Sequence, residues 1–150
     1  MKLSVVLSTH AARFEAVAFK GDFEANIAKI AAWGYDGVEL AIRDPDLVNA
    51  DDLQSLVSTY GLKVPAIGTG QAWGEEGLSF TSSQATVRLA AVERINRHIA
   101  LAARLDAVII LGLIRGTTPQ GQNHTQSMRY LIESLQECAA AACCPLDCRR

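Results

Sequence analysis

The sequence lacks a Lys/Arg cluster, a long apolar run and a nucleotide-binding glycine loop, and each absence removes a class of protein. The 14 Lys and Arg residues are outnumbered by 16 Asp and Glu residues, for a formal net charge of -2, which argues against a surface built to neutralise nucleic-acid phosphates. No stretch approaches the roughly 20 apolar residues of a membrane helix, and the short N-terminal apolar run does not fit a signal peptide. We therefore expect a cytoplasmic protein that binds neither nucleic acid nor membrane.

Cysteine is absent from most of the chain. All four cysteines lie between Cys138 and Cys148, whereas a disulfide scaffold would spread them along the sequence to close loops. The adjacent Cys143 and Cys144 do not form the C-x2-C knuckle of a zinc site. We predict one domain over residues 1–142 and an aberrant Cys/Arg-rich tail over residues 143–150, produced by a reading-frame shift or disordered.

Hydrophobic periodicity predicts four consecutive strand-helix units. The chain is 49% hydrophobic and 20% charged, as in a single globular domain. Strands are expected at 2–8, 36–41, 62–68 and 107–111, and helices at 22–34, 51–61 and 83–105 and around Leu131. Residues 69–82 are rich in Gly and Ser and are predicted to form a long loop.

Alternating strands and helices require a parallel sheet with right-handed crossovers. Two architectures satisfy this requirement: an open doubly wound sheet, or part of a closed (β/α)8 barrel whose full form takes about 250 residues. Neither a G-x-G-x-x-G nor a P-loop turn follows the first strand, so the common nucleotide-binding open sheets lose support.

Residues 34–40 read Gly-Tyr-Asp-Gly-Val-Glu-Leu between a predicted helix and a loop. This segment resembles the G-[YF]-D-G-[VI]-E-[LI] signature of the xylose isomerase-like TIM barrel superfamily. The lead into the third strand at 61–64, the long helix at 83–105 and the strand at 108–112 follow in the order and spacing of its sugar phosphate isomerases and epimerases. The resemblance covers residues 1 to about 142, and it implies the N-terminal half of a TIM barrel.

The resemblance also implies a chemistry. Members of the superfamily hold a divalent metal, Mn, Mg or Zn, through side chains on strands five to eight, and carboxylates move a proton next to a carbonyl. Those strands are not among the four predicted here, so we expect this chain alone to bind no metal and to be inactive on its sugar or sugar phosphate. The metal-dependent abasic-site endonucleases share the superfamily's fold but take histidine ligands from the ends of strands three and four, where this chain has Gly68-Thr69 and Gly112-Leu113. A relative of these endonucleases is therefore less favoured and stays as an alternative function.

Substrates of such barrels meet residues at the carboxyl ends of the strands. The candidates for substrate binding are His10, Glu39, Gly68, Thr69, Gln71, Gly112 and Arg115.

Each polar candidate has an ordinary structural alternative. Glu39 can accept a hydrogen bond from a substrate hydroxyl or form a structural ion pair, because a carboxylate that faces a barrel interior needs a partner. Thr69 and Gln71 can bind a sugar or be plain loop residues. His10 can relay a proton, and Arg115 can clamp a phosphate, but solvated loop side chains are the commoner case for both.

Gly68 and Gly112 at strand ends would let a ligand approach the backbone closely. His98 and His124 lie on predicted helices and are interpreted as surface residues.

Two alternatives to a truncated enzyme stay open: a finished open α/β module that binds a ligand or partner without catalysis, and a product with no function. Four strands without closure expose two sheet edges and an apolar inner face. We therefore predict poor solubility, a homodimer or aggregation through these edges, or a molten state.

Overall fold

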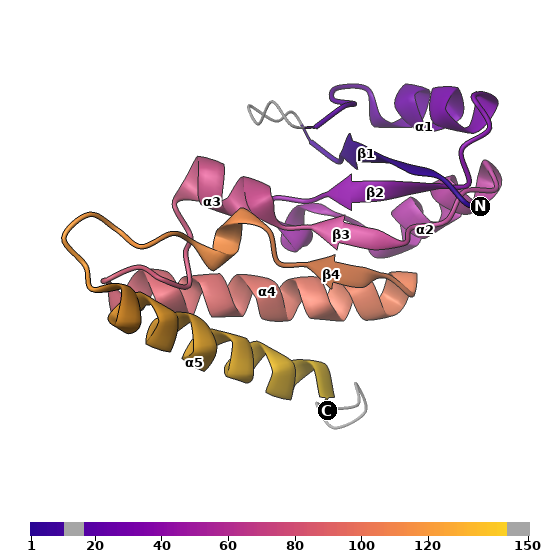
Figure 1. Cartoon of the computed structure of the whole chain (residues 1–150). Coiled ribbons are helices and arrows are strands. Elements are labelled where there is room, and N and C mark those ends of the chain that lie inside the picture. The colour runs from indigo at the N-terminus through magenta and orange to yellow at the C-terminus, as the bar shows by residue number, and fades with distance from the viewer. Residues whose placement is uncertain (11–16, 144–150) are drawn as a thin grey trace.

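The computed structural model describes residues 1–10 and 17–143, and in this part of the chain it contains one parallel sheet of four strands. The strands are β1 (Ser4–Ser8), β2 (Gly37–Ala41), β3 (Ala66–Gly68) and β4 (Val108–Ile110), paired in chain order. Figure 1 shows them side by side, with α1 beyond β1 and α4 beyond β4. The predicted α/β fold with four consecutive parallel β/α units is confirmed.

Five α-helices and two 3-10 turns connect and cover the described strands. The α-helices are α1 (Phe23–Ala32), α2 (Ala50–Thr59), α3 (Gly70–Glu76), α4 (Ala85–Leu105) and α5 (His124–Cys143), and the 3-10 turns are η1 (Pro45–Leu47) and η2 (Leu113–Arg115). The ends of α1 are those the sequence predicts. The Asp22 side chain accepts a hydrogen bond from the Ala25 N–H at 3.0 Å, and Gly34 follows the helix with a left-handed φ of +80°.

Three local predictions were wrong. The segment predicted as a long loop contains α3, a short helix that was not predicted because two of its seven residues, Gly70 and Gly74, are glycines, which disfavour helices. The long helix begins at Ala85 with Gln84, not Ser83, at its N-cap. The third strand is shorter than predicted because Pro65 has no N–H for the ladder, and Lys63 makes only an isolated bridge to Gly37.

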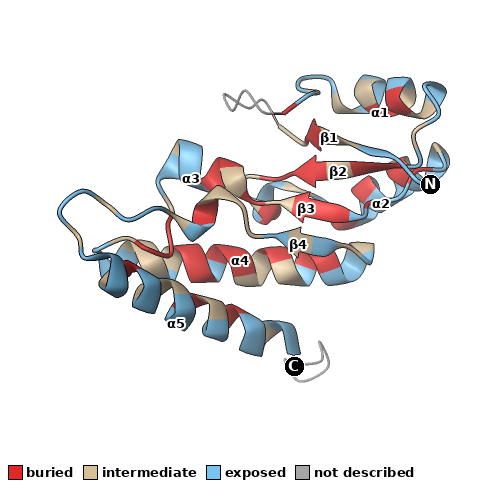
Figure 2. Cartoon of the chain, in the orientation of Figure 1, coloured by how far each residue is buried: buried red, intermediate tan, exposed pale blue. Residues whose placement is uncertain are grey.

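The two faces of the sheet differ in burial. Leu7, Val38, Leu40 and Ile67 are fully buried on the face that packs against α1, α2 and α4. Glu39 alternates with Val38 and Leu40 and therefore points to the opposite face, where it is half-buried, as the sequence predicts. On that face we also find β4 exposed (Figure 2). The sheet has the covered outer side and open inner side of an unclosed barrel.

A second core lies between α4, α5 and the loops at the carboxyl ends of the strands. Phe80 and Ile114 are completely buried in it, and the Phe80 N–H donates to the Ile114 carbonyl oxygen at 3.0 Å. Helix α5 continues to Cys143, one residue into the predicted tail. The rest of that tail lies outside the described residues, so its origin stays a prediction. Over 1–10 and 17–143, no helix is both long and apolar enough to cross a membrane.

Candidate functional site at the carboxyl ends of the strands

The ends of β1 and β3 are joined by a buried hydrogen bond. Gln71, 2% exposed at the start of α3, donates from Nε2 to Ser8 Oγ at 2.9 Å. Ser8 Oγ donates in turn to the His10 carbonyl oxygen at 2.7 Å, and the His10 ring lies half-buried with Nδ1 3.0 Å from Thr9 Oγ1. The Gln71 side chain thus fixes the start of the loop after β1, while the His10 ring is partly exposed to solvent.

Thr69 makes the equivalent link between β3 and β4. Its side chain is fully buried, and Oγ1 donates to the Ile110 carbonyl oxygen at 3.0 Å. Thr69 and Gln71 are both buried, and each already uses a side-chain donor within the fold. Their predicted role in substrate binding stays a prediction, and the geometry favours the structural alternative.

Glu39 is the candidate that faces the open side of the sheet. Within the described residues its carboxylate has neither a hydrogen-bond donor nor an ion-pair partner. A Cβ atom added at Gly68, on the neighbouring strand, would lie an ordinary 3.7 Å from Glu39 Oε1. The absence of a side chain at Gly68 therefore keeps the space beside this carboxylate clear, which suits the approach of a hydroxyl group.

Gly112 and Arg115 follow β4, Gly112 just before the 3-10 turn η2 and Arg115 as its last residue. A Cβ atom at Gly112 would meet nothing within 4 Å, so packing does not demand a glycine there. Arg115 is exposed and forms no ion pair with the described part of the chain. Its guanidinium is free to bind an anion.

An ionic cluster around the buried Arg94, near the end of β2, was missed by the sequence analysis. Arg94 of α4 forms a bidentate pair with Glu76 (Nη2–Oε2 2.8 Å, Nη1–Oε1 3.1 Å), contacts Asp44 Oδ2 at 3.1 Å and donates to the Arg43 carbonyl oxygen at 2.7 Å. Arg43 pairs with Glu75 at 3.1 Å. The cluster clamps the β2 loop to α3 and α4.

His98, interpreted from sequence as a surface residue, is completely buried, and this interpretation was wrong. Its Nε2 lies 3.0 Å from the Ile42 carbonyl oxygen and its Nδ1 2.9 Å from that of Arg94. A spacing signal was available, because Ala91, Arg94, His98 and Leu101 recur at three and four residues on one face of α4. His124 is exposed, as predicted.

Burial lowers the pKa of His98 from its ordinary value of 6.5, and the Arg94 charge acts in the same direction, against the two carbonyls and Asp44, which raise it. A neutral imidazole can donate through only one nitrogen. Protonation would satisfy both carbonyls but would place a second cation beside Arg94.

We expect the free energy of unfolding to fall as the pH drops below about 6.5, because the unfolded chain takes up a proton that folded His98 resists. The loss is at most about 1.4 kcal/mol per pH unit and ends below the folded pKa. His98→Gln should flatten this dependence in urea unfolding, whereas His124→Gln, at an exposed site, should leave it unchanged. Equal slopes in wild type and His98→Gln would contradict the assignment.

The described residues do not fit a divalent metal. Across 1–10 and 17–143, no group of three or more His, Cys, Asp or Glu side chains is arranged to hold an ion. The two candidates with metal-binding side chains are Glu39 on β2 and His10 in the loop after β1, and neither belongs to such a group. The open sheet face therefore offers the Glu39 carboxylate, and the Arg115 guanidinium follows β4 in η2. His10 instead lines a pocket with residues of α1, η1 and α2.

These features define an α/β half barrel with polar side chains at the carboxyl ends of its strands. The family model for the xylose isomerase-like TIM barrel matches residues 27–143. The chain belongs to this family. A comparison with curated proteins gave no match.

Solved structures with the same fold are similar to the chain over nearly its whole length. One is D-psicose 3-epimerase in the presence of D-fructose, 18% identical with a TM-score of 0.67, over 95% of this chain and 48% of that one. Another is an AP endonuclease of family 2 from Brucella melitensis, 14% identical with a TM-score of 0.64, over 93% and 50%. A third is L-ribulose 3-epimerase, 23% identical with a TM-score of 0.58, over 92% and 46%.

The chain thus spans about half the length of the structures that it matches. These identities are low, so the comparison shows the fold. It agrees with the partial TIM barrel predicted from the sequence. It does not show the activity of a whole protein.

Proposed function

We propose that this chain supplies the N-terminal half of the substrate-binding mouth of a sugar or sugar phosphate isomerase or epimerase. The observation that carries the proposal is Glu39, a half-buried carboxylate without a partner in the described chain, aimed at the open inner face beside Gly68. Such a carboxylate is costly unless a donor reaches it, and a sugar hydroxyl is a suitable donor.

Proton transfer next to a carbonyl would need groups that this half barrel does not offer. The described residues provide no metal-binding cluster, so the divalent metal that the family resemblance implies, Mn, Mg or Zn, would be held by four further β/α units. Arg115 would bind the phosphate of a phosphorylated sugar. The formal charge of -2 supports a small metabolite over DNA as the substrate.

The proposal is tested by completing the barrel. Residues 1–142 are joined to strands five to eight of D-psicose 3-epimerase, and Mn²⁺ binding and epimerisation of D-fructose are measured for the joined protein and for the chain alone. We expect metal binding and turnover only in the joined protein. Turnover by the chain alone would place the catalytic groups among His10, Glu39 and Arg115 and would overturn the proposed division of labour.

Glu39 is tested in the same joined protein. Glu39→Gln should lower kcat/KM by roughly 10- to 100-fold, the loss of a charged hydrogen bond to substrate of about 1.4–2.8 kcal/mol. The matched control is Glu24→Gln, an exposed carboxylate in the first turn of α1, which should leave kcat/KM unchanged. If Glu39→Gln is as active as the parent, Glu39 does not contact the sugar.

A further inference from the structure

The two edge strands of the sheet, β1 and β4, each have an outer edge that is wholly or partly unpaired within the described chain. On β4, Val108 is 64% and Ile110 40% exposed, and within the described chain its outer edge has no strand beside it. On β1, the outer edge carries only a bridge to Phe19 at its carboxyl end, where the Ser8 N–H donates to the Phe19 carbonyl oxygen. The beginning of β1 is free, and Leu3 just before it is 51% exposed.

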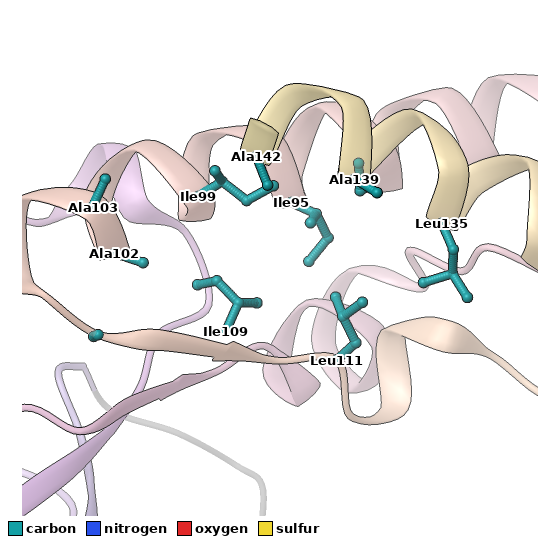
Figure 3. Close-up of a pocket in the computed structure, with 11 residues that line it drawn as sticks. Ile95, Ile99, Ala102, Ala103, Ile109, Leu111, Leu135, Ala139 and Ala142 are labelled. Atoms are coloured by element: carbon teal, nitrogen blue, oxygen red, sulfur yellow. The ribbon is translucent and has the colours of Figure 1, made fainter. Parts of the chain in front are cut away.

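An apolar cavity of about 540 Å³ adjoins β4 on the side of the sheet that faces the helices. Figure 3 shows Ile109 and Leu111 of the β4 segment on one side of it, opposite Ile95 and Ile99 of α4 and Leu135 of α5. A strand paired with β4 would direct every second side chain toward this side of the sheet. The cavity is therefore suited to apolar side chains from such a strand.

The charges at the starts of the two edge strands are opposite. Lys2 stands two residues before β1, and Asp106 stands two residues before β4. Both are exposed, and neither forms an ion pair with another described residue. When a β1 strand lies parallel to β4, these two side chains come to the same end of the seam.

We propose that two copies of this chain close into one eight-stranded barrel. The β1 strand of each copy pairs in parallel with β4 of the other, so the two seams are identical and related by a two-fold axis. Leu3 and Val5 of the second copy enter the cavity beside β4, and Lys2 of the second copy meets Asp106. Four strands from each copy give the eight that a closed barrel of this type requires, and closure removes every free edge.

The partner is a second copy because β1 and β4 are opposite edges of the same parallel sheet. Pairing β4 with β4 of another copy would be antiparallel and would leave both β1 edges open. The inference does not depend on the proposed function, since it needs neither sugar nor metal, and its failure would leave that proposal intact.

The purified 150-residue chain is examined by sedimentation equilibrium over a range of concentrations. We expect a single species of about twice the monomer mass of 16.1 kDa. Val108→Asp should weaken dimerisation at least 100-fold by placing a carboxylate in each seam. The matched control is Leu47→Asp, also at an exposed aliphatic residue but in the 3-10 turn η1 after the central strand β2, and it should dimerise as the wild type does.

A zero-length carbodiimide cross-linker distinguishes the seam from other interfaces. Mass spectrometry should find Lys2 joined to Asp106 between two chains, and Asp106→Asn, which tolerates the left-handed φ of +54° at this position, should remove the link. A monomer at all concentrations, an unaffected Val108→Asp dimer, or a dimer lacking this link would each overturn the proposal. Open-ended assemblies would also overturn it, because they show seams that do not close.

Discussion

Replacing Arg94 by alanine should lower the free energy of unfolding by about 2–3 kcal/mol. Arg94 is almost completely buried, and it pairs with Glu76 through both terminal nitrogens, Nη1 and Nη2, and with Asp44 through Nη2. Breaking a fully buried ion pair from one side costs about 3–5 kcal/mol. The cost is lower here because the carboxylates of Asp44 and Glu76 remain 22% and 31% exposed and can recover some water.

Arg97 provides the matched control, since it lies one turn along the same helix and pairs with Asp46 at 3.1 Å on the surface. Arg97→Ala should cost no more than about 1 kcal/mol, as is usual for an exposed pair. Both variants are compared with wild type by urea unfolding, followed by circular dichroism at one protein concentration, because self-association would shift the midpoint. An equal loss of unfolding free energy in the two variants would show that the cluster around Arg94 stabilises the fold no more than an exposed ion pair does.

Gly116→Ala should destabilise the chain by about 3 kcal/mol or more. Gly116 has φ +83° and ψ -175°, a region that is open almost only to glycine and costs other residues about 1–3 kcal/mol. A Cβ atom there would also overlap Ser79 Oγ and Thr81 Oγ1. Both residues are buried, on either side of Phe80 in the chain, and Thr81 Oγ1 donates to the Thr117 carbonyl oxygen at 2.6 Å. Forcing a methyl group into such packing adds about 1–3 kcal/mol.

The control for this substitution lies five residues further along the same loop. Gly121 also has a positive φ, +80°, but a Cβ atom there would meet nothing within 4 Å. Gly121→Ala should therefore cost only the backbone strain of about 1–2 kcal/mol. Thermal or urea unfolding of both variants separates the two effects, and a Gly116→Ala variant no less stable than Gly121→Ala would show that the hydroxyl pair moves aside freely.

The order and direction of the strands could be predicted because local signals dominate there. Asp22 and Gly34 mark both ends of α1, and Val38, Glu39 and Leu40 alternate as a strand with two different faces should. Each of these signals lies within a few residues of the structure it specifies. The inward direction of Glu39 follows from that alternation alone.

The contacts at the carboxyl ends of the strands could not be predicted, because each joins residues far apart in sequence. Gln71 reaches Ser8, and Thr69 reaches the backbone of Ile110, so polar side chains that suggest ligand binding are occupied within the fold. The buried Arg94 shows the same limit. The buried stripe of α4 on which it lies can be recognised from the sequence, but its partners are far apart in the chain, Asp44 after β2 and Glu76 at the end of α3.

The hydrogen bonds of Gln71 and Thr69 have a consequence for how such a half could find its complement. They tie β1 to α3 and β3 to β4 at one end of the sheet, so the strand ends are fixed before any further unit is present. A sheet held in this way is preorganised, and a preorganised surface loses less conformational entropy when it associates. A strand that pairs with β4 would therefore meet an edge whose end is already fixed at Ile110.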